Sequence, residues 1–219
     1  MVRRAWVILL LSVFASVVHV ADAQADIAFH VIFSPATIEP GTYYLDFQLN
    51  DGDGAGPNNT ARIVNLTGAS PLGSPGVPPS VGAVTGDPSS TSGLEITDAQ
   101  PINEFAQQFT PGGVVEFDVF LTTHADAGIP DQFSFALLNA ALDSVETTAF
   151  NSSFFYFDIF PVTTLADAQV FGSLSGSVPA PVLIPIQADN NVAEPASIVL
   201  VLSALLFMCK AAMGAPGQA

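Results

Sequence analysis

The chain has 219 residues and carries twenty acidic residues against four basic ones, which gives a formal net charge of −16. A surface this acidic repels the phosphates of nucleic acids, so nucleic acid is excluded as a partner. The length is enough for one ordinary domain with its targeting segments. The single cysteine, Cys209, excludes a disulfide framework within one chain.

The N-terminal end has the layout of a secretory signal peptide. Two arginines, Arg3 and Arg4, precede an apolar run, and the small residues Ala21 and Ala23 have the spacing of a cleavage site. We therefore expect residues 1–23 to be removed on export. A first transmembrane helix is the alternative, and the shortness of the apolar run disfavours it.

Hydrophobic and polar residues alternate with a period of two in the central part of the chain. Such alternation is typical of antiparallel strands with one face in a core and the other in water. The segments lie at 27–33, 42–50, 61–67, 114–122, 132–139 and 154–160. Between them the sequence is rich in Gly, Pro, Asn, Asp and Ser, which favour turns.

These segments predict an all-β protein of seven to nine short strands. We expect an antiparallel two-sheet β-sandwich with a jelly-roll-like arrangement. Its core is predicted to hold the inward-facing members of the alternating segments: Tyr43, Leu45, Phe47, Leu49, Val115, Phe117, Val119, Leu121, Phe133, Phe135, Leu137, Phe155, Phe157 and Ile159.

Two stretches fit this pattern less well. Residues 103–109 and 137–150 are candidates for a helical turn or two. After residue 177 three prolines occur within eight residues, which favours an extended spacer over a strand. We therefore expect a β-sandwich domain at 24–177 and a proline-rich spacer at 178–193.

A second apolar run, Ile198–Met208, follows the spacer and is ended by Lys210. Eight of its residues are Leu, Ile, Val or Phe, which favours membrane insertion by about 2–5 kcal/mol. A buried core helix is the alternative, since the run is short for a bilayer. We expect insertion because the run lacks helical amphipathicity and the Lys210 amine can reach water at the membrane edge.

The residues before this run resemble the PEP-CTERM sorting signal of exported bacterial proteins. Glu194 and Pro195 match the end of the Pro-Glu-Pro motif, and Ala196 and Ser197 match the residues that usually follow it. In that family a membrane-embedded exosortase recognises the motif and is thought to cleave or transfer the protein there. The resemblance implies an exosortase-like partner and a link to exopolysaccharide and biofilm.

This C-terminal segment departs from the family pattern at two places. Ala193 stands where the first proline is usual, and Lys210 stands alone where a cluster of arginines is usual. Residues 194–213 are then the sorting and transmembrane segment, and residues 214–219 form a tail. The expected location is a precursor anchored in the inner membrane, and then the cell envelope or the extracellular space.

The middle of the chain is similar to a group of small proteins that carry this signal. The similarity lies in "YYLDFQLNDGDGAGPNNTARIVNLTG", residues 43–68, which reads as a strand, a Gly/Asn-rich turn and a second strand. It implies export and a β-sandwich, and it implies no activity.

Asp51 and Asp53, in "NDGDG", are candidate calcium ligands. An EF-hand loop that begins at Asp51 needs an oxygen ligand at its fifth position and a glutamate at its twelfth. Ala55 and Arg62 stand at these positions, so the EF-hand motif fails. A looser calcium site is possible, and a plain hairpin turn is the favoured interpretation.

Two further sets of residues are candidate catalytic groups. His124 and Asp126 have the types of a base and its orienting carboxylate, but no nucleophile motif accompanies them, which favours a turn. Three acidic residues on strands are candidates for paired glycosidase carboxylates, with solvated strand faces as the favoured interpretation: Glu116, Asp118 and Asp158. His30 is expected to meet solvent on a polar strand face.

These observations predict an exported, non-enzymatic protein of the envelope or extracellular matrix. Its expected role is structural or adhesive, through contact of its acidic faces with extracellular polysaccharide. A calcium-dependent or carbohydrate-binding lectin-like module is the alternative, and a secreted hydrolase is the least favoured. No zinc-type cluster or phosphate-binding glycine loop occurs, so no cofactor is expected apart from calcium. The acidity itself fits a saline habitat as well as a binding role.

Overall fold

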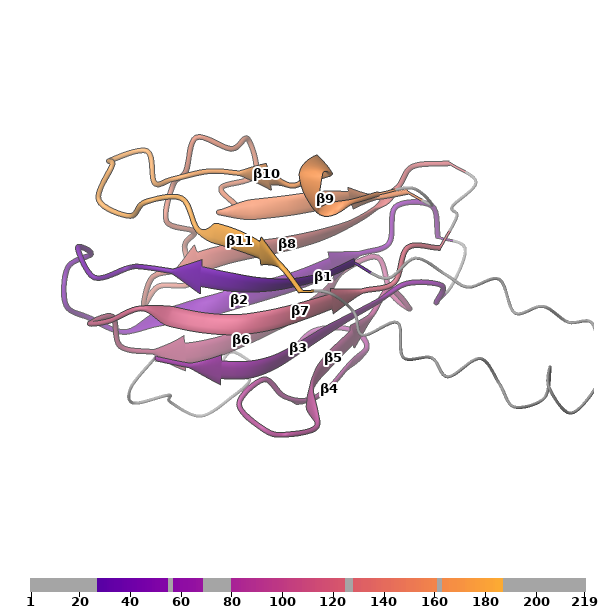
Figure 1. The fold of residues 1–219 in the computed structure, drawn as a ribbon, viewed down its shortest axis with the longest axis horizontal. Coiled ribbons are helices and arrows are strands. Elements are labelled where there is room, and N and C mark those ends of the chain that lie inside the picture. The colour runs from indigo at the N-terminus through magenta and orange to yellow at the C-terminus, as the bar shows by residue number, and fades with distance from the viewer. Residues whose placement is uncertain (1–26, 55–56, 69–79, 125–127, 161–162, 187–219) are drawn as a thin grey trace, which may run out of the picture.

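The computed structural model describes residues 27–54, 57–68, 80–124, 128–160 and 163–186, and these form two antiparallel β-sheets packed face to face (Figure 1). The prediction of an all-β, antiparallel fold is confirmed. The strands are β1 (Ile27–Phe33), β2 (Tyr43–Asn50), β3 (Thr60–Thr67), β4 (Val84–Asp87), β5 (Gly93–Thr97), β6 (Asn103–Phe109), β7 (Val115–Leu121), β8 (Asp131–Leu138), β9 (Phe155–Ile159), β10 (Gln169–Val170) and β11 (Val182–Pro185).

The two sheets share the strands unequally. Sheet A has six strands in the order β11-β1-β7-β3-β5-β4, and sheet B has five in the order β10-β9-β8-β2-β6. Neighbouring strands within a sheet are antiparallel throughout. In Figure 1 the strands of sheet A lie in front of those of sheet B and run in nearly the same direction. The only helical element among the described residues is the 3-10 turn η1 (Leu165–Asp167).

Phenylalanine fills most of the space between the sheets. Ten of the twelve largest fully buried side chains are phenylalanines. Rings from the two sheets contact each other, as in the edge-to-face pair of Phe47 and Phe117, whose centroids lie 5.2 Å apart. Phe29 of sheet A and Phe157 of sheet B also contact each other, in a tilted arrangement with ring centroids 5.1 Å apart. Each buried ring contributes about 1.5–3 kcal/mol, so the alternation of the sequence supplies the core directly.

The predicted core residues are confirmed with one partial exception. All of them are buried except Tyr43, which is only partly buried and packs against the edge of the core. Tyr43 stands at the first position of β2, where the strand enters the sheet. Its place at the strand end explains why its ring is only partly covered.

Two predictions of local structure are wrong. Residues 103–109 form strand β6 and no helical turn: every second residue from Asn103 to Phe109 is buried, and Phe105 and Phe109 among them reach the core. The spacer at 178–193 contains strand β11, which pairs with the outer edge of β1. Leu183 packs against the core from this edge, and edge strands tolerate proline because their outer N–H groups need no partner.

The structure also adds strands where turns were expected. β4 and β5 form a hairpin whose turn ends at Gly93, with φ at +80°. A Cβ atom at Gly93 would lie 2.4 Å from Val64 Cγ1, so only glycine fits between this hairpin and β3. Leu94 and Ile96 of β5 then reach the core.

The predicted signal peptide, the sorting motif and the apolar run before Lys210 lie outside the described residues. Within the described ranges, the structure has no helix of the length and apolarity needed to cross a membrane.

Candidate functional site

The predicted calcium loop is a turn that its own aspartate holds. Asp51 Oδ1 accepts hydrogen bonds from the backbone N–H of Asp53 at 3.1 Å and of Gly54 at 2.7 Å. This is the Asx-type arrangement by which aspartate stabilises a turn. Among the described residues, no group of three or more His, Cys, Asp or Glu side chains could hold a metal ion. Calcium binding at Asp51 and Asp53 stays a prediction.

The same loop is tied to a buried polar group at one end of the sandwich, the right-hand end in Figure 1. Asp131, the first residue of β8, is buried and accepts two hydrogen bonds. Its Oδ1 atom accepts from the backbone N–H of Gly52 at 2.8 Å, and its Oδ2 atom accepts from Asn59 Nδ2 at 2.8 Å. Asp131 therefore joins the β2–β3 loop to the start of β8.

Asp98, just after β5, is the second buried carboxylate at this end. Its Oδ1 atom accepts from the backbone N–H of Asn58 at 3.0 Å, and its Oδ2 atom accepts from that of Asn59 at 2.7 Å. Burial, and then the neighbouring Asp98 carboxyl, raise the pKa of Asp131 to about 6, although the bonds from Asn59 and Gly52 act in the opposite direction. We call Gly52, Asn59, Asp98 and Asp131 the end cluster.

The backbone of His124 is hydrogen-bonded to this end cluster. Its N–H donates to Asn59 Oδ1 at 2.7 Å, while its Nδ1 atom is buried without a hydrogen-bond partner. Asp126, its predicted partner, lies outside the described residues. A catalytic role for His124 stays a hypothesis. The contact that the structure shows for it is structural, since it closes the loop after β7.

The contact between the loops is close enough to require glycine. A Cβ atom at Gly52 would lie 2.2 Å from the backbone oxygen of Pro130 and 2.5 Å from that of Ile129. Real Cβ atoms do not approach oxygen so closely, so the β2–β3 loop lies directly against the β7–β8 loop. The sequence carries no signal for this contact beyond the presence of Gly and Asp in both loops.

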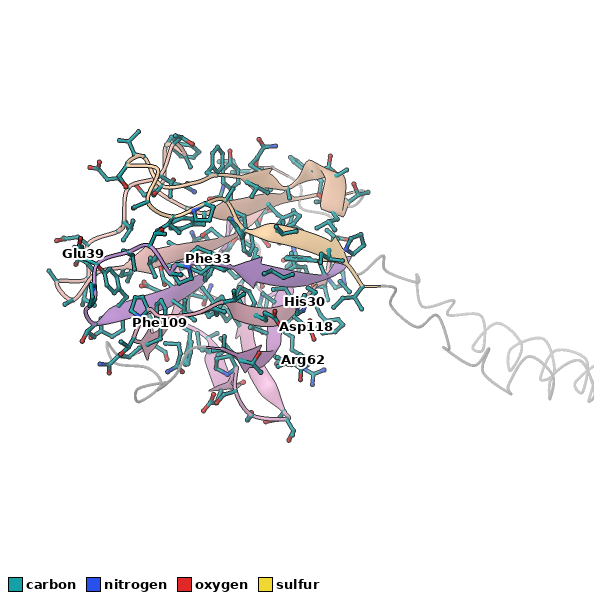
Figure 2. The ribbon with its side chains drawn as sticks, turned by 60° about the vertical axis from the view of Figure 1, so that its left-hand side comes forward. His30, Phe33, Glu39, Arg62, Phe109 and Asp118 are labelled. Atoms are coloured by element: carbon teal, nitrogen blue, oxygen red, sulfur yellow. The ribbon has the colours of Figure 1, made fainter. Side chains whose placement is uncertain are left out.

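On the outer face of sheet A, His30 of β1 lies opposite Asp118 of β7, as Figure 2 shows. His30 Nδ1 and Asp118 Oδ1 are 2.7 Å apart, and Asn65 Nδ2 donates to Asp118 Oδ2 at 2.7 Å. Glu116 Oε2 is 3.9 Å from His30 Nε2. The expectation that His30 and Asp118 simply meet solvent is therefore corrected: their side chains are 30% and 16% exposed and are bonded to each other.

The three strand carboxylates weighed as glycosidase groups do not form one site. Glu116 and Asp118 lie on the outer face of sheet A, whereas Asp158 lies on the outer face of sheet B, where it accepts from Gln132 Nε2 at 2.8 Å. The phenylalanine core separates these two faces. Asp158 therefore cannot flank one glycosidic bond together with either of the other two.

Sheet B carries an acidic pair that the sequence did not reveal. Asp46 of β2 was predicted to point into water, yet it is only 1% exposed. Its Oδ2 atom accepts from Gln48 Nε2 at 2.7 Å, and its Oδ1 atom is buried without a hydrogen-bond partner. Burial, and then the charge of Glu104 on β6, raise the pKa of Asp46 to about 8. Asp46 is therefore protonated at neutral pH.

The outer face of sheet B also carries three aromatic rings in contact, of which Phe150 is exposed and Tyr156 and Phe171 are partly exposed. Phe171 stacks on Tyr156 of β9 with ring centroids 5.8 Å apart and an angle of 16° between the rings. Phe150 meets the same tyrosine edge-to-face at 6.0 Å and is 85% exposed. We call Phe150, Tyr156 and Phe171 the aromatic platform. Beside it, Asn151 Nδ2 donates to Gln132 Oε1 at 3.4 Å.

The described part of the molecule thus presents two buried acidic groups, a histidine–aspartate pair on sheet A and an aromatic platform on sheet B. In comparisons with known proteins, no family model, no curated protein and no solved structure matches the chain.

Proposed function

We propose that the protein is an exported, non-enzymatic component of the cell envelope or extracellular matrix with a structural or adhesive role. In this proposal a PEP-CTERM-like signal sorts a jelly-roll-like β-sandwich, with an exosortase-like enzyme as its processing partner. Divalent cations, calcium above all, join its acidic surface to extracellular polysaccharide.

The imbalance of charge among the described residues carries the proposal. Arg62 is the only lysine or arginine in the described ranges, and its guanidinium donates to the backbone oxygen of Ser92 at 3.2 and 3.3 Å. The ion pairs found there are those of His30. Six carboxylates are exposed: Glu39, Glu95, Asp143, Glu146, Asp158 and Asp167.

Such a surface has to draw its counterions from solution. Carboxylate oxygens are the ligands that calcium prefers, and a cation shared between two anionic chains links them without any preformed cage.

Co-sedimentation tests the cation-bridged contact. The full-length chain, kept in a mild detergent, is mixed with an anionic polysaccharide such as alginate and titrated with calcium chloride below the concentration at which the polymer itself gels. We expect the protein to enter the polymer fraction with calcium and to leave it with a chelator. Sodium chloride of equal ionic strength is the control, because it screens charge without bridging.

A variant with Glu39, Glu95 and Glu146 all changed to glutamine removes three exposed charges and keeps the side-chain shapes. It should need more calcium than the parent for the same co-sedimentation. Co-sedimentation that neither calcium nor the triple variant affects would contradict the proposal. The intact mass of the extracellular form tests sorting separately: a product ending near Glu194 supports cleavage, and one that retains Cys209 and Lys210 indicates a standing anchor.

A further inference from the structure

We propose that the outer face of sheet B binds a neutral polysaccharide chain, which lies across the strands and stacks on the aromatic platform. This inference deepens the proposed function, since it names a ligand class and a surface for the carbohydrate contact. It differs from the cation-bridged contact in that it needs neither calcium nor a charged polymer.

The aromatic platform supplies the stacking surface. Phe150 is 85% exposed and does not stand alone, since it lies against the partly exposed rings of the platform; contiguous apolar surface of this kind marks a contact site. Its ring stands edge-on to Tyr156, whose other neighbour, Phe171, lies parallel to it. Phe150 therefore offers the open ring of the platform, supported by the Tyr156–Phe171 stack, and the C–H face of a pyranose ring packs on such a ring.

A straight row of polar side chains continues from the platform across the whole of sheet B. Residues directly opposite each other on neighbouring strands share a face, and the observed register places five such residues in line. From β6 to β10 they are Glu104, Gln48, Ser134, Tyr156 and Gln169, and all but the buried Ser134 are at least partly exposed. Four steps between strands span about 19 Å, which is enough for several linked sugar rings.

The chemistry of this row suits hydroxyl groups. Amide, hydroxyl and carboxylate side chains together offer both donors and acceptors, as the hydroxyls of a sugar require. The hydrogen bonds that link Gln132 to Asp158 and to Asn151 hold a second polar set beside the platform. Next to the row, Ala106 and Ala136 lie opposite Asp46, so no large side chain projects from these two positions.

Charge selects a neutral ligand over an anionic one. The charged group of the row is Glu104, and Asp158, which bonds to Gln132 beside the platform, is also negative. Arg62, the single described arginine, lies on sheet A. Uronic acid polymers are therefore repelled from this face in the absence of a bridging cation. A second copy of the chain is disfavoured for the same reason, because a two-fold contact sets these carboxylates against each other.

Affinity electrophoresis tests the inference. The full-length chain, in a mild neutral detergent with a chelator present, is run in native gels that contain dextran, hydroxyethylcellulose, mannan, laminarin or the anionic alginate. We expect retardation by at least one neutral polymer and none by alginate. Phe150→Ala should weaken this binding about tenfold, which corresponds to the loss of one aromatic contact.

Two matched variants separate binding from folding. Phe150→Tyr keeps the ring and should bind like the parent chain. Phe160→Ala removes another exposed phenylalanine, which stands just after β9 and contacts none of the platform rings, and should also leave binding unchanged.

Three outcomes would overturn the inference: no retardation by any neutral polymer, retardation by alginate alone, or equal weakening in Phe150→Ala and Phe160→Ala. Self-association that Phe150→Ala abolishes, without binding of any polymer, would assign the platform to a second copy and overturn it as well. Because a chelator is present, failure here leaves the calcium-dependent co-sedimentation standing as a separate result.

Discussion

The end cluster and the Asp46–Glu104 pair bury carboxyl groups in two different ways. In the end cluster, Asp98 and Asp131 each accept two N–H donors, three of the four from the backbone. In the middle of sheet B, Asp46 has one side-chain donor, Gln48, and an oxygen that has none. The first arrangement solvates negative charge with fixed N–H groups, whereas the second favours a neutral carboxylic acid.

This difference in hydrogen-bond donors explains why the pKa of Asp46 is higher than that of Asp131. Burial raises both, but the donors around Asp131 stabilise its charged form and hold its pKa at about 6. Asp46, with the negative Glu104 beside it, has a pKa of about 8. The Glu104 carboxylate is thus the neighbour toward which the proton of a neutral Asp46 is favoured. One group therefore serves as a charged fastener of loops and the other as an uncharged link between two strands.

The substitution Asp131→Ala should break the end cluster and have the largest effect. It leaves the N–H of Gly52 and the side-chain amide of Asn59 without an acceptor inside the protein, at about 1–3 kcal/mol for each buried donor. We expect the free energy of unfolding to fall by about 2–5 kcal/mol, measured by urea unfolding at pH 7. Asp143→Ala, which removes an exposed carboxylate, is the control and should change stability by less than about 0.5 kcal/mol. Equal losses in the two variants would show that the cluster does not fasten the loops.

The pH dependence of stability sharpens the comparison at Asp46. Its folded pKa of about 8 lies above the ordinary value of 3.8, so its contribution to the stability of the folded state is full below about pH 4, falls as the pH rises toward 8 and is constant above that. Between pH 6 and pH 9 the free energy of unfolding should fall by about 2–3 kcal/mol, measured by urea unfolding at each pH. Asp46→Asn cannot ionise and should remove this decline. A decline of the same size in Asp46→Asn would assign it to another group.

At Asp131 the same rule predicts a change at lower pH. Its contribution falls as the pH rises from about 4 to about 6 and is constant above that range.

The substitution Gly52→Ala tests the loop contact that positions Asp131. A Cβ atom 2.2 Å from the oxygen of Pro130 forces the two loops apart, and overpacking of this kind costs about 1–3 kcal/mol. We expect a lower thermal midpoint in a calorimetric scan. Gly112→Ala is the matched control, since a Cβ atom there meets nothing within 4 Å and its φ is not positive. A Gly52→Ala variant as stable as Gly112→Ala would contradict the close contact.

The His30–Asp118 pair is the partly exposed counterpart of the two buried groups and should matter least. His30→Gln keeps a polar side chain opposite Asp118, and pairs on an exposed face contribute about 1 kcal/mol or less. The expected change in the free energy of unfolding is therefore below about 1 kcal/mol. His30→Ala serves as the comparison, and a loss above 3 kcal/mol in either variant would show that this face is buried by a partner.

The core residues were predictable because the alternation of apolar and polar residues within each strand determines which side chains point inward. In β7, Val115 and Phe117 point inward while Glu116 and Asp118 point outward, as alternation alone requires. The position of a residue on the outer face, however, does not determine its burial. Asp46 stands on the outer side of its strand and is still only 1% exposed, with Gln48 bonded to it and Glu104, from a strand distant in the sequence, beside it.

The strands β4, β5, β6 and β11 were missed or misassigned for a related reason. Each is short or proline-rich or has weak alternation, and each is held by the edge of a neighbouring strand. Hydrogen bonds to β1 define β11, and those to β3 define β5. A segment of this kind has no preference strong enough to be recognised before its partner is known.

By itself, the sequence determined the all-β class, the inward residues of the long strands and the acidic character, because all three follow from residue type and a period of two. Only the tertiary structure decided which polar residues meet. The end cluster gathers side chains from separate loops, and the row across sheet B depends on a register that one slipped residue would destroy. The physical reason is that burial and hydrogen bonding are properties of neighbours in space, and neighbours across strands are chosen by the whole sheet.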